Sequence, residues 1–220
     1  MTTVAAVHTG VFMVDLIKDL CAEILPDDVR IISVVDDSII PEAIAAGGVT
    51  PTIIKRLISY YQAGVDAGAD IIFHTCSSVG EVTDLGAKQL TIPLFRIDIP
   101  MATKAVEMGD AVGVLATLPT TLGPTVRLIK SRSAELNKNV DVLEGLAEGA
   151  FDRFLAGDTN THDQMILDTA MNLADKVDVF VLAQASMSRM ENLLAEKTGK
   201  PVISSPRLGV MELKRKLAEL

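Results

Sequence analysis

The sequence predicts an α/β fold made of two similar halves, each with a parallel sheet. Short runs of β-branched residues alternate with longer stretches of helical period, which is typical of βαβ units. One strand-and-turn pattern recurs 108 residues further along the chain. The 220 residues, 49% of them hydrophobic, suffice for one large α/β domain or two small ones, and exclude a disordered, collagen-like or disulfide-scaffold chain.

The first half is expected to hold four strands and two helices. The strands are predicted over residues 4–7, 30–35, 70–74 and 92–97. One helix is expected over residues 11–25, where apolar residues recur at helical spacing. A second begins at Pro51, behind a capping threonine, and runs to Gly64 or Gly68. The third strand is apolar in its middle, so it is expected to be buried on both faces.

The second half repeats this alternation. Strands are predicted over residues 111–115, 140–143, 178–182 and 201–204. Helices are predicted over residues 101–108, 125–133, 163–174, 190–197 and 210–220. No linker rich in Ser, Gly or Pro separates any two elements. We expect residues 1–98 and 205–220 to form one lobe and residues 99–204 the other.

The internal repeat is the most informative feature of the sequence. Asp70 opens a four-residue strand that ends in a small polar turn, and Asp178 opens another of the same pattern. The shared offset of 108 residues also relates three further pairs: Pro93 and Pro201, Val4 and Val112, Thr9 and Thr117. A duplication would account for this common register. A single doubly wound sheet with similar units is the alternative.

A duplication would place the two halves about a pseudo-twofold axis, with the active site in the cleft between them. Ligands of open parallel sheets bind beyond the carboxyl ends of the strands. The turns expected there are rich in hydroxyl groups and run into helix N-termini, which hold anions. They comprise residues 8–10, 75–78, 117–121 and 183–186. A small carboxylate suits such a site.

These turns resemble the aspartate/glutamate/hydantoin racemase superfamily, which includes maleate isomerase and arylmalonate decarboxylase. The resemblance lies in Thr75-Cys76-Ser77-Ser78, in the matched turn 108 residues later, and in Ala116-Thr117 with Thr120-Thr121 between them. It covers essentially the whole chain. The family fold agrees with the two halves derived above.

The resemblance implies cofactor-independent chemistry next to a carboxylate. In that family two cysteines flank the substrate α-carbon, one removing a proton and the other delivering one. Here Cys76 occupies the first position and Gln184 the second. A glutamine does not exchange a proton at useful pH, so the symmetric two-base mechanism does not transfer. The family's decarboxylases also keep a single cysteine, but in the second half.

Each candidate residue has a structural alternative. Cys76, at a strand-to-helix turn, is expected to have a lowered thiol pKa. Its alternative is an inert buried cysteine, which is how we interpret Cys21. Gln184 orients a carboxylate or a water, or is a tolerated substitution. The candidate substrate-binding residues, whose hydroxyl members equally suit helix capping, are His8, Thr9, Thr75, Ser77, Ser78, Thr117, Thr120, Thr121, Ala185 and Ser186.

Several classes of partner are disfavoured. The formal net charge of −9 disfavours polyanions such as nucleic acid. The histidines His8, His74 and His162 lack ligand-like spacing, so no metal is expected, and His74 is interpreted as a core residue. No dinucleotide or phosphate-loop motif occurs. Without a membrane-length apolar run or a basic signal-peptide start, the protein is expected to be cytoplasmic, with both cysteines reduced and a homo-oligomer possible.

Two functions from different classes follow. The first is a cofactor-independent isomerase or racemase-like enzyme that acts on a small carboxylic acid with Cys76 as its single acid/base or nucleophile, with a decarboxylase as the runner-up. The second is a small-carboxylate binding protein that has lost catalysis. A serine or cysteine hydrolase is disfavoured, because residues 76–80 lack the leading glycine and the acid and histidine order of a nucleophile elbow.

Overall fold

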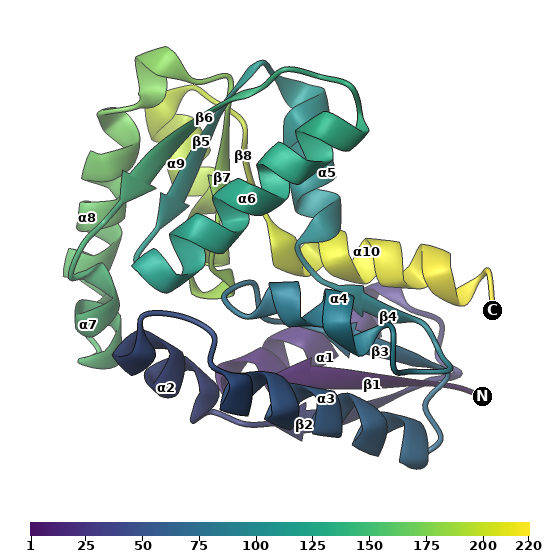
Figure 1. The fold of residues 1–220 in the computed structure, drawn as a ribbon. Coiled ribbons are helices and arrows are strands. Elements are labelled where there is room, and N and C mark those ends of the chain that lie inside the picture. Colours follow the sequence, from purple (N-terminus) through teal and green to yellow (C-terminus); the bar gives the residue numbers. More distant parts are fainter. The chain divides into compact units, whose positions relative to one another are not determined.

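The computed structural model describes residues 1–220 and contains two four-stranded parallel sheets, each flanked by helices (Figure 1). Internal contacts divide the chain into two units. The first unit comprises Met1–Asp98 and Pro206–Leu220, and the second comprises Ile99–Ser205. The predicted α/β fold with two similar halves is confirmed.

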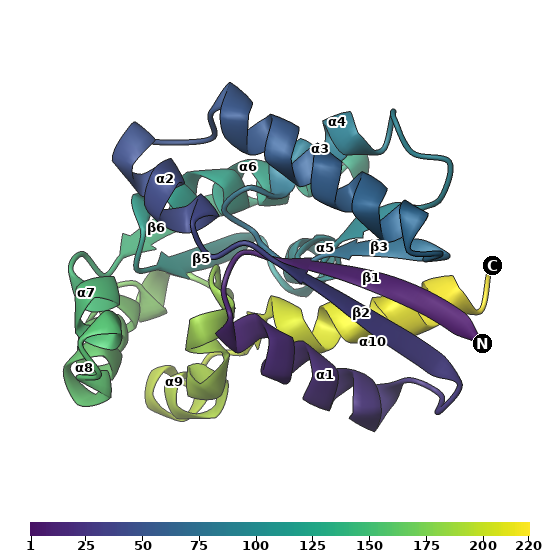
Figure 2. The same cartoon turned by 90° about the horizontal axis from the view of Figure 1, so that it is seen from below.

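The first unit has the strand order β2-β1-β3-β4. Its strands are β1 (Thr2–His8), β2 (Val29–Val35), β3 (Ile71–His74) and β4 (Leu94–Arg96). Its helices are α1 (Phe12–Ile24), α2 (Ile39–Ala46), α3 (Pro51–Asp66), the 3-10 helix η1 (Gly80–Val82), α4 (Thr83–Gly86) and α10 (Ser205–Leu217). Figure 2 shows α1 and α10 on one face of this sheet and α3 and α4 on the other. β3 is buried along its whole length, as its apolar sequence predicts.

The second unit has the strand order β6-β5-β7-β8. Its strands are β5 (Ala111–Ala116), β6 (Asp141–Leu146), β7 (Val179–Leu182) and β8 (Val202–Ser204). Its helices are α5 (Ile99–Met108), α6 (Pro119–Glu135), α7 (Ala150–Leu155), α8 (Thr159–Met171), η2 (Ala174–Lys176), η3 (Ala185–Met190) and α9 (Glu191–Thr198). α5 and α6 cover one face of the sheet, and α8 and α9 cover the other (Figure 1).

The 108-residue offset holds in the strand pairing. Val4 pairs with Ile71 in the first unit, and Val112 pairs with Val179 in the second. The pairing of β3 with β4 is repeated at the same offset by that of β7 with β8.

The two acidic residues that open the matched strands make equivalent hydrogen bonds. The carboxylate of Asp70 accepts from the backbone N–H of Thr3 at 2.8 Å, and that of Asp178 accepts from Ala111 at 2.9 Å. The backbone N–H of each aspartate donates in return, to the carbonyl of Thr3 or of Ala111, at 2.8 Å in both cases. Each aspartate therefore pins the start of its strand against the first strand of its unit.

Three segments near the site differ from the sequence-based prediction. α6 begins at Pro119, so Thr120 and Thr121 lie in its first turn, whereas the sequence placed them in the preceding loop. Ala185 and Ser186 likewise lie in η3 and not in a turn. The loop after β3 leads into the three-residue 3-10 helix η1 and the four-residue α4, in a segment for which no helix bounds were predicted. The helices α2, α4 and α7 were not predicted.

The two glycines inside α3 and α6 provide a test of how closely the helices pack. A Cβ added at Gly64 of α3 would lie 2.7 Å from the Cβ of Ala5 in β1, whereas one at Gly123 of α6 would meet only the flexible end of Arg127, at 3.3 Å. We predict that Gly64→Ala lowers the free energy of unfolding by about 1–3 kcal/mol through overpacking. Gly123→Ala should change it by less than about 1 kcal/mol in either direction, because the gain in helix propensity is opposed by crowding of the new Cβ against the ring of Pro124. Urea denaturation of both variants measures this, and equal effects would contradict the packing.

Candidate active site

Cys76 lies two residues beyond β3, at the carboxyl edge of the first sheet, and is half-buried. Three donors surround its sulfur. The Thr9 hydroxyl, from the end of β1, and the backbone N–H groups of Ser78 and Val79 hydrogen-bond to Sγ. Preorganised donors of this kind stabilise a thiolate or a negative charge that develops on the sulfur. The structure therefore brings Cys76, Thr9 and Ser78 together.

The pKa of Cys76 moves in the direction opposite to the sequence-based expectation. Burial of the sulfur raises the thiol pKa, and the hydrogen bonds from Thr9, Val79 and Ser78 oppose this without overcoming it. The prediction relied on a helix N-terminus and nearby N–H donors after the strand. The turn leads into the short η1 and α4, and the donors that are present do not offset the burial of the sulfur. The resting thiol therefore keeps its proton at neutral pH.

His8, at the end of β1, is buried and has one unpaired ring nitrogen. Its Nδ1 lies 2.8 Å from the hydroxyl of Thr75. That hydroxyl donates its single proton to the carbonyl of Val7, at 3.1 Å, so His8 Nδ1 must be the protonated nitrogen and the donor. The network thereby assigns a lone pair to Nε2, which is buried and has no partner. Burial, with a smaller contribution from Lys18, lowers the pKa of His8 to about 4.

His74, the last residue of β3, is fully buried and has both ring nitrogens paired. Nδ1 lies 3.0 Å from the hydroxyl of Tyr61 in α3, and Nε2 lies 2.8 Å from the backbone carbonyl of Cys76. Burial, followed by the positive charge of Arg96, lowers the pKa of His74 to about 4. The core position expected for His74 is thus correct, but the residue also contacts the backbone of Cys76.

A buried ion pair lies next to the loop that carries Cys76. Arg96 of β4 donates from Nε and Nη2 to the two carboxylate oxygens of Asp98, at 2.6 and 2.8 Å. A Cβ added to Gly80 of η1 would lie 2.5 Å from the Arg96 guanidinium, so only glycine allows this approach. Sequence reasoning missed this pair. The signal in the sequence was that Arg96 and Asp98 carry opposite charges, lie two residues apart and interrupt an otherwise apolar stretch. In an extended segment, residues two apart point to the same face.

In the second unit, Gln184 occupies the position that corresponds to Cys76. Its Oε1 accepts hydrogen bonds from the backbone N–H of Thr117 at 2.6 Å and from the Thr117 hydroxyl at 3.0 Å. Thr117 corresponds to Thr9 at the 108-residue offset, so each unit directs a threonine hydroxyl at the side chain after its third strand. Both donors of Thr117 are directed at Gln184 in this structure.

The remaining predicted residues differ in whether their polar groups have hydrogen-bond partners. Thr120 has a buried hydroxyl without a partner, and Pro124, which lacks an N–H, removes the helical donor to the Thr120 carbonyl. By contrast, Thr121 and Ser77 are buried, and their carbonyls accept from Thr125 and Gly80. Ala185 and Ser186 are half-buried in η3.

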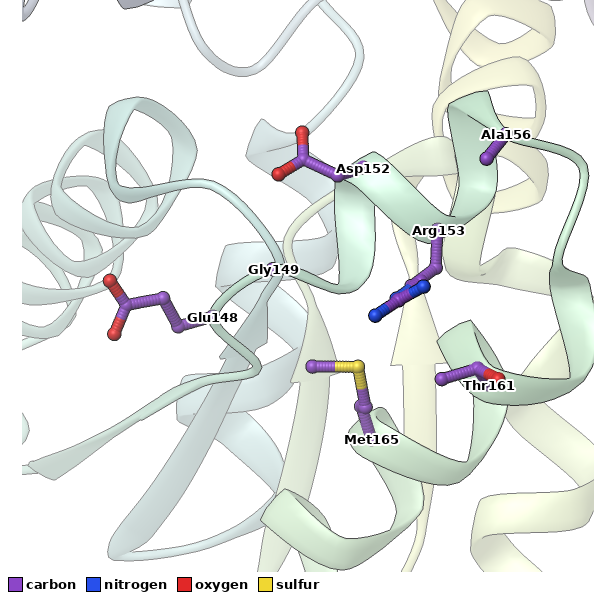
Figure 3. A pocket seen from close by; sticks show the side chains of 7 residues that line it. All are labelled: Glu148, Gly149, Asp152, Arg153, Ala156, Thr161 and Met165. Atoms are coloured by element: carbon purple, nitrogen blue, oxygen red, sulfur yellow. The ribbon is translucent and has the colours of Figure 1, made fainter.

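A hollow of about 410 Å³ lies elsewhere in the second unit, and none of the predicted residues lines it. Its lining comes from the loop after β6, from α7 and from α8, and comprises Glu148, Gly149, Asp152, Arg153, Ala156, Thr161 and Met165. Figure 3 shows the Arg153 guanidinium between Met165 and Thr161, while the carboxylates of Glu148 and Asp152 point away from it. This hollow has no thiol or histidine, so Cys76 and its surroundings remain the candidate site.

No group of three or more His, Cys, Asp or Glu side chains is arranged to hold a metal ion. None of the helices combines the length and apolar character needed to cross a membrane.

The two buried histidines predict a specific acid sensitivity. Unfolding returns the pKa of each to about 6.5. Between pH 6.5 and 4 the unfolded chain therefore binds more protons than the folded one, and stability falls as the pH falls. We predict that each histidine contributes up to about 3 kcal/mol to this loss. In His74→Gln the loss between pH 7 and 4.5, measured by urea denaturation, should be smaller than in the wild type, and an unchanged pH dependence would contradict the assignment.

The chain was compared with known proteins. No curated protein matches its sequence. Glutamate racemase of Bacillus anthracis is 16% identical with a TM-score of 0.76, over 99% of this chain and 82% of that one. Allantoin racemase of Klebsiella pneumoniae is 17% identical with a TM-score of 0.73, over 100% and 89% of the two chains.

Unliganded arylmalonate decarboxylase is 13% identical with a TM-score of 0.58, over 98% of this chain and 92% of that one. The TM-scores show that these proteins share the fold of this chain. The model of the Asp/Glu/hydantoin racemase family matches residues 4–213, nearly the whole chain, and the protein therefore belongs to that family.

Proposed function

We propose that the protein is a cofactor-independent, isomerase or racemase-like enzyme that acts at the carbon next to the carboxylate of a small acid. Cys76 serves as its single acid/base or nucleophile. The observation that carries this proposal is the convergence of the Thr9 hydroxyl and the N–H groups of Ser78 and Val79 on the Cys76 sulfur. Membership of the racemase family supports the reaction class.

The chemistry proposed for Cys76 uses one proton carrier. Gln184 stands at the corresponding position of the second unit, and its amide neither takes up nor releases a proton near neutral pH. Two routes need only one thiol. In one, Cys76 exchanges a proton with the carbon next to the carboxylate. In the other, Cys76 first gives up its proton and the thiolate adds to one carbon of a carbon–carbon double bond, whose electron pair moves to the other carbon and its carboxylate. After rotation the pair re-forms the double bond, the thiolate leaves and Cys76 takes up a proton again, so the bond is isomerised.

Some of the proposed substrate-binding residues offer a hydrogen-bond donor or acceptor to the substrate, and the others shape the site. The lone pair on His8 Nε2 accepts a hydrogen bond, and the Thr120 hydroxyl offers a donor. Gln184 has its oxygen held by Thr117, which leaves its amide nitrogen to donate to a carboxylate. The other predicted residues are proposed to shape the site: Thr9, Thr75, Ser77, Ser78, Thr117, Thr121, Ala185 and Ser186.

A decarboxylase is the second candidate, and the protonated state of Cys76 favours it. Loss of carbon dioxide leaves a carbanion or enediolate that needs one proton. A thiol whose pKa burial raises holds that proton at neutral pH and can donate it. The fold shared with arylmalonate decarboxylase is consistent with this route.

The proposal predicts that turnover depends on Cys76. The protein is incubated in deuterium oxide with aspartate, glutamate, hydantoins, maleate and substituted malonates, and the α-carbon is followed by NMR. We expect exchange, isomerisation or loss of carbon dioxide for at least one acid. Cys76→Ala should reduce that rate by about 10²–10⁴-fold, because it removes the proton carrier.

Cys21→Ala is the matched control, since Cys21 is a buried thiol of α1 whose pKa burial raises to about 11. It should keep the wild-type rate, and urea denaturation should show both variants folded. Turnover that survives Cys76→Ala contradicts the proposal. Binding of acids without any chemistry across the panel would instead indicate a carboxylate-binding protein.

A further inference from the structure

A chain of polar side chains runs from α3 through β3 to the backbone of Cys76. The Tyr61 hydroxyl lies 3.0 Å from His74 Nδ1, and His74 Nε2 lies 2.8 Å from the Cys76 carbonyl oxygen. The rings of Tyr61 and His74 meet edge to face, with centroids 5.8 Å apart. Tyr61 and His74 are both fully buried, so no water competes for these bonds.

The chemistry of the groups fixes the direction of both hydrogen bonds. A carbonyl oxygen only accepts, so His74 Nε2 must carry the proton and donate to Cys76. A neutral imidazole has one N–H, so Nδ1 is an acceptor and the Tyr61 hydroxyl donates to it. Tyr61 therefore selects the tautomer of His74 that can hold the Cys76 carbonyl.

The second unit provides an internal comparison. At the 108-residue offset, Leu182 of β7 corresponds to His74, in the same register against the first strand of its sheet. Leu182 is fully buried, so this strand packs well with an apolar residue at that position. The fold alone does not require a histidine there. The unit that carries the thiol has the polar chain, and the unit that carries Gln184 has leucine in its place.

We propose that His74, oriented by Tyr61, is a positioning residue that holds the peptide carbonyl of Cys76. Fixing this carbonyl fixes the peptide that follows it, and so keeps the N–H groups of Ser78 and Val79 directed at the sulfur. A benefit to catalysis rests on the proposed function. The effect on the ease with which Cys76 loses its proton does not depend on that function.

The charges around His74 leave the imidazole neutral, so the hydrogen bonds from Tyr61 through His74 to Cys76 are preserved. Arg96 and Asp98 act on the ring with opposite signs and are paired with each other, and the other titratable neighbours of His74 are Tyr61 of α3 and His8 of β1. The hydrogen bonds of Arg96 go to Asp98, and His74 is the side chain that hydrogen-bonds to the Cys76 carbonyl.

The test measures alkylation of Cys76 by iodoacetamide against pH in the free protein, with mass spectrometry distinguishing Cys76 from Cys21. His74→Leu introduces the residue of the second unit and removes the donor. His74→Gln is its matched control, because the glutamine N–H can reach the carbonyl. We expect the midpoint to rise by about half a pH unit or more in His74→Leu, equal to about threefold slower alkylation at a fixed pH below it. His74→Gln should keep the wild-type midpoint.

A second variant and an NMR measurement test the proposal even if His74→Leu does not fold. Tyr61→Phe keeps the ring and removes the hydroxyl, and it should raise the midpoint in the same direction. ¹⁵N chemical shifts of His74 at pH 7 should show a protonated Nε2 and an unprotonated Nδ1. The opposite tautomer, unchanged midpoints, or equal shifts in His74→Leu and His74→Gln would overturn the positioning role. Loss of turnover is not needed for any of these results, so they stand apart from the test of the proposed function.

Discussion

The register between the first and third strands of each unit is the constraint on which the rest of the structure depends. Asp70 and Asp178 set this register, because their carboxylates accept hydrogen bonds from the backbone N–H groups of Thr3 and Ala111. With the strand starts pinned, the residue two positions past each third strand is placed beside the threonine that follows the first strand. Parallel pairing then brings Thr9 to Cys76 in one unit and Thr117 to Gln184 in the other.

The same arrangement of strands therefore carries chemically different side chains in the two units. In the first unit the threonine hydroxyl meets a thiol that can carry a proton or attack carbon, and buried histidines flank it. In the second unit the same hydroxyl and its N–H are satisfied by an amide oxygen, so the amide can only orient a ligand. This asymmetry supports a one-thiol reaction within a family whose fold is built from two similar halves.

The sequence predicts the strands and the repeat well because apolar runs and a shared offset are local signals. It places Thr120 and Thr121 wrongly, since hydroxyl residues suit a cap as well as a first turn, and Pro124 conceals that the helix has already begun at Pro119. The sign of the Cys76 pKa shift depends on how deeply the sulfur is buried, which no local pattern encodes. The same holds for the bond of His74 to the Cys76 carbonyl, which forms only after β3 and α3 pack.

The most direct test of a reactive thiol in a carboxylate-binding site compares iodoacetate with iodoacetamide as alkylating reagents of the wild-type protein. The two differ by a carboxylate in place of a neutral amide. The account predicts that iodoacetate modifies Cys76 in preference to Cys21, that its rate saturates with concentration, and that it exceeds the rate of iodoacetamide. A rate that stays proportional to iodoacetate concentration and below that of iodoacetamide would contradict it.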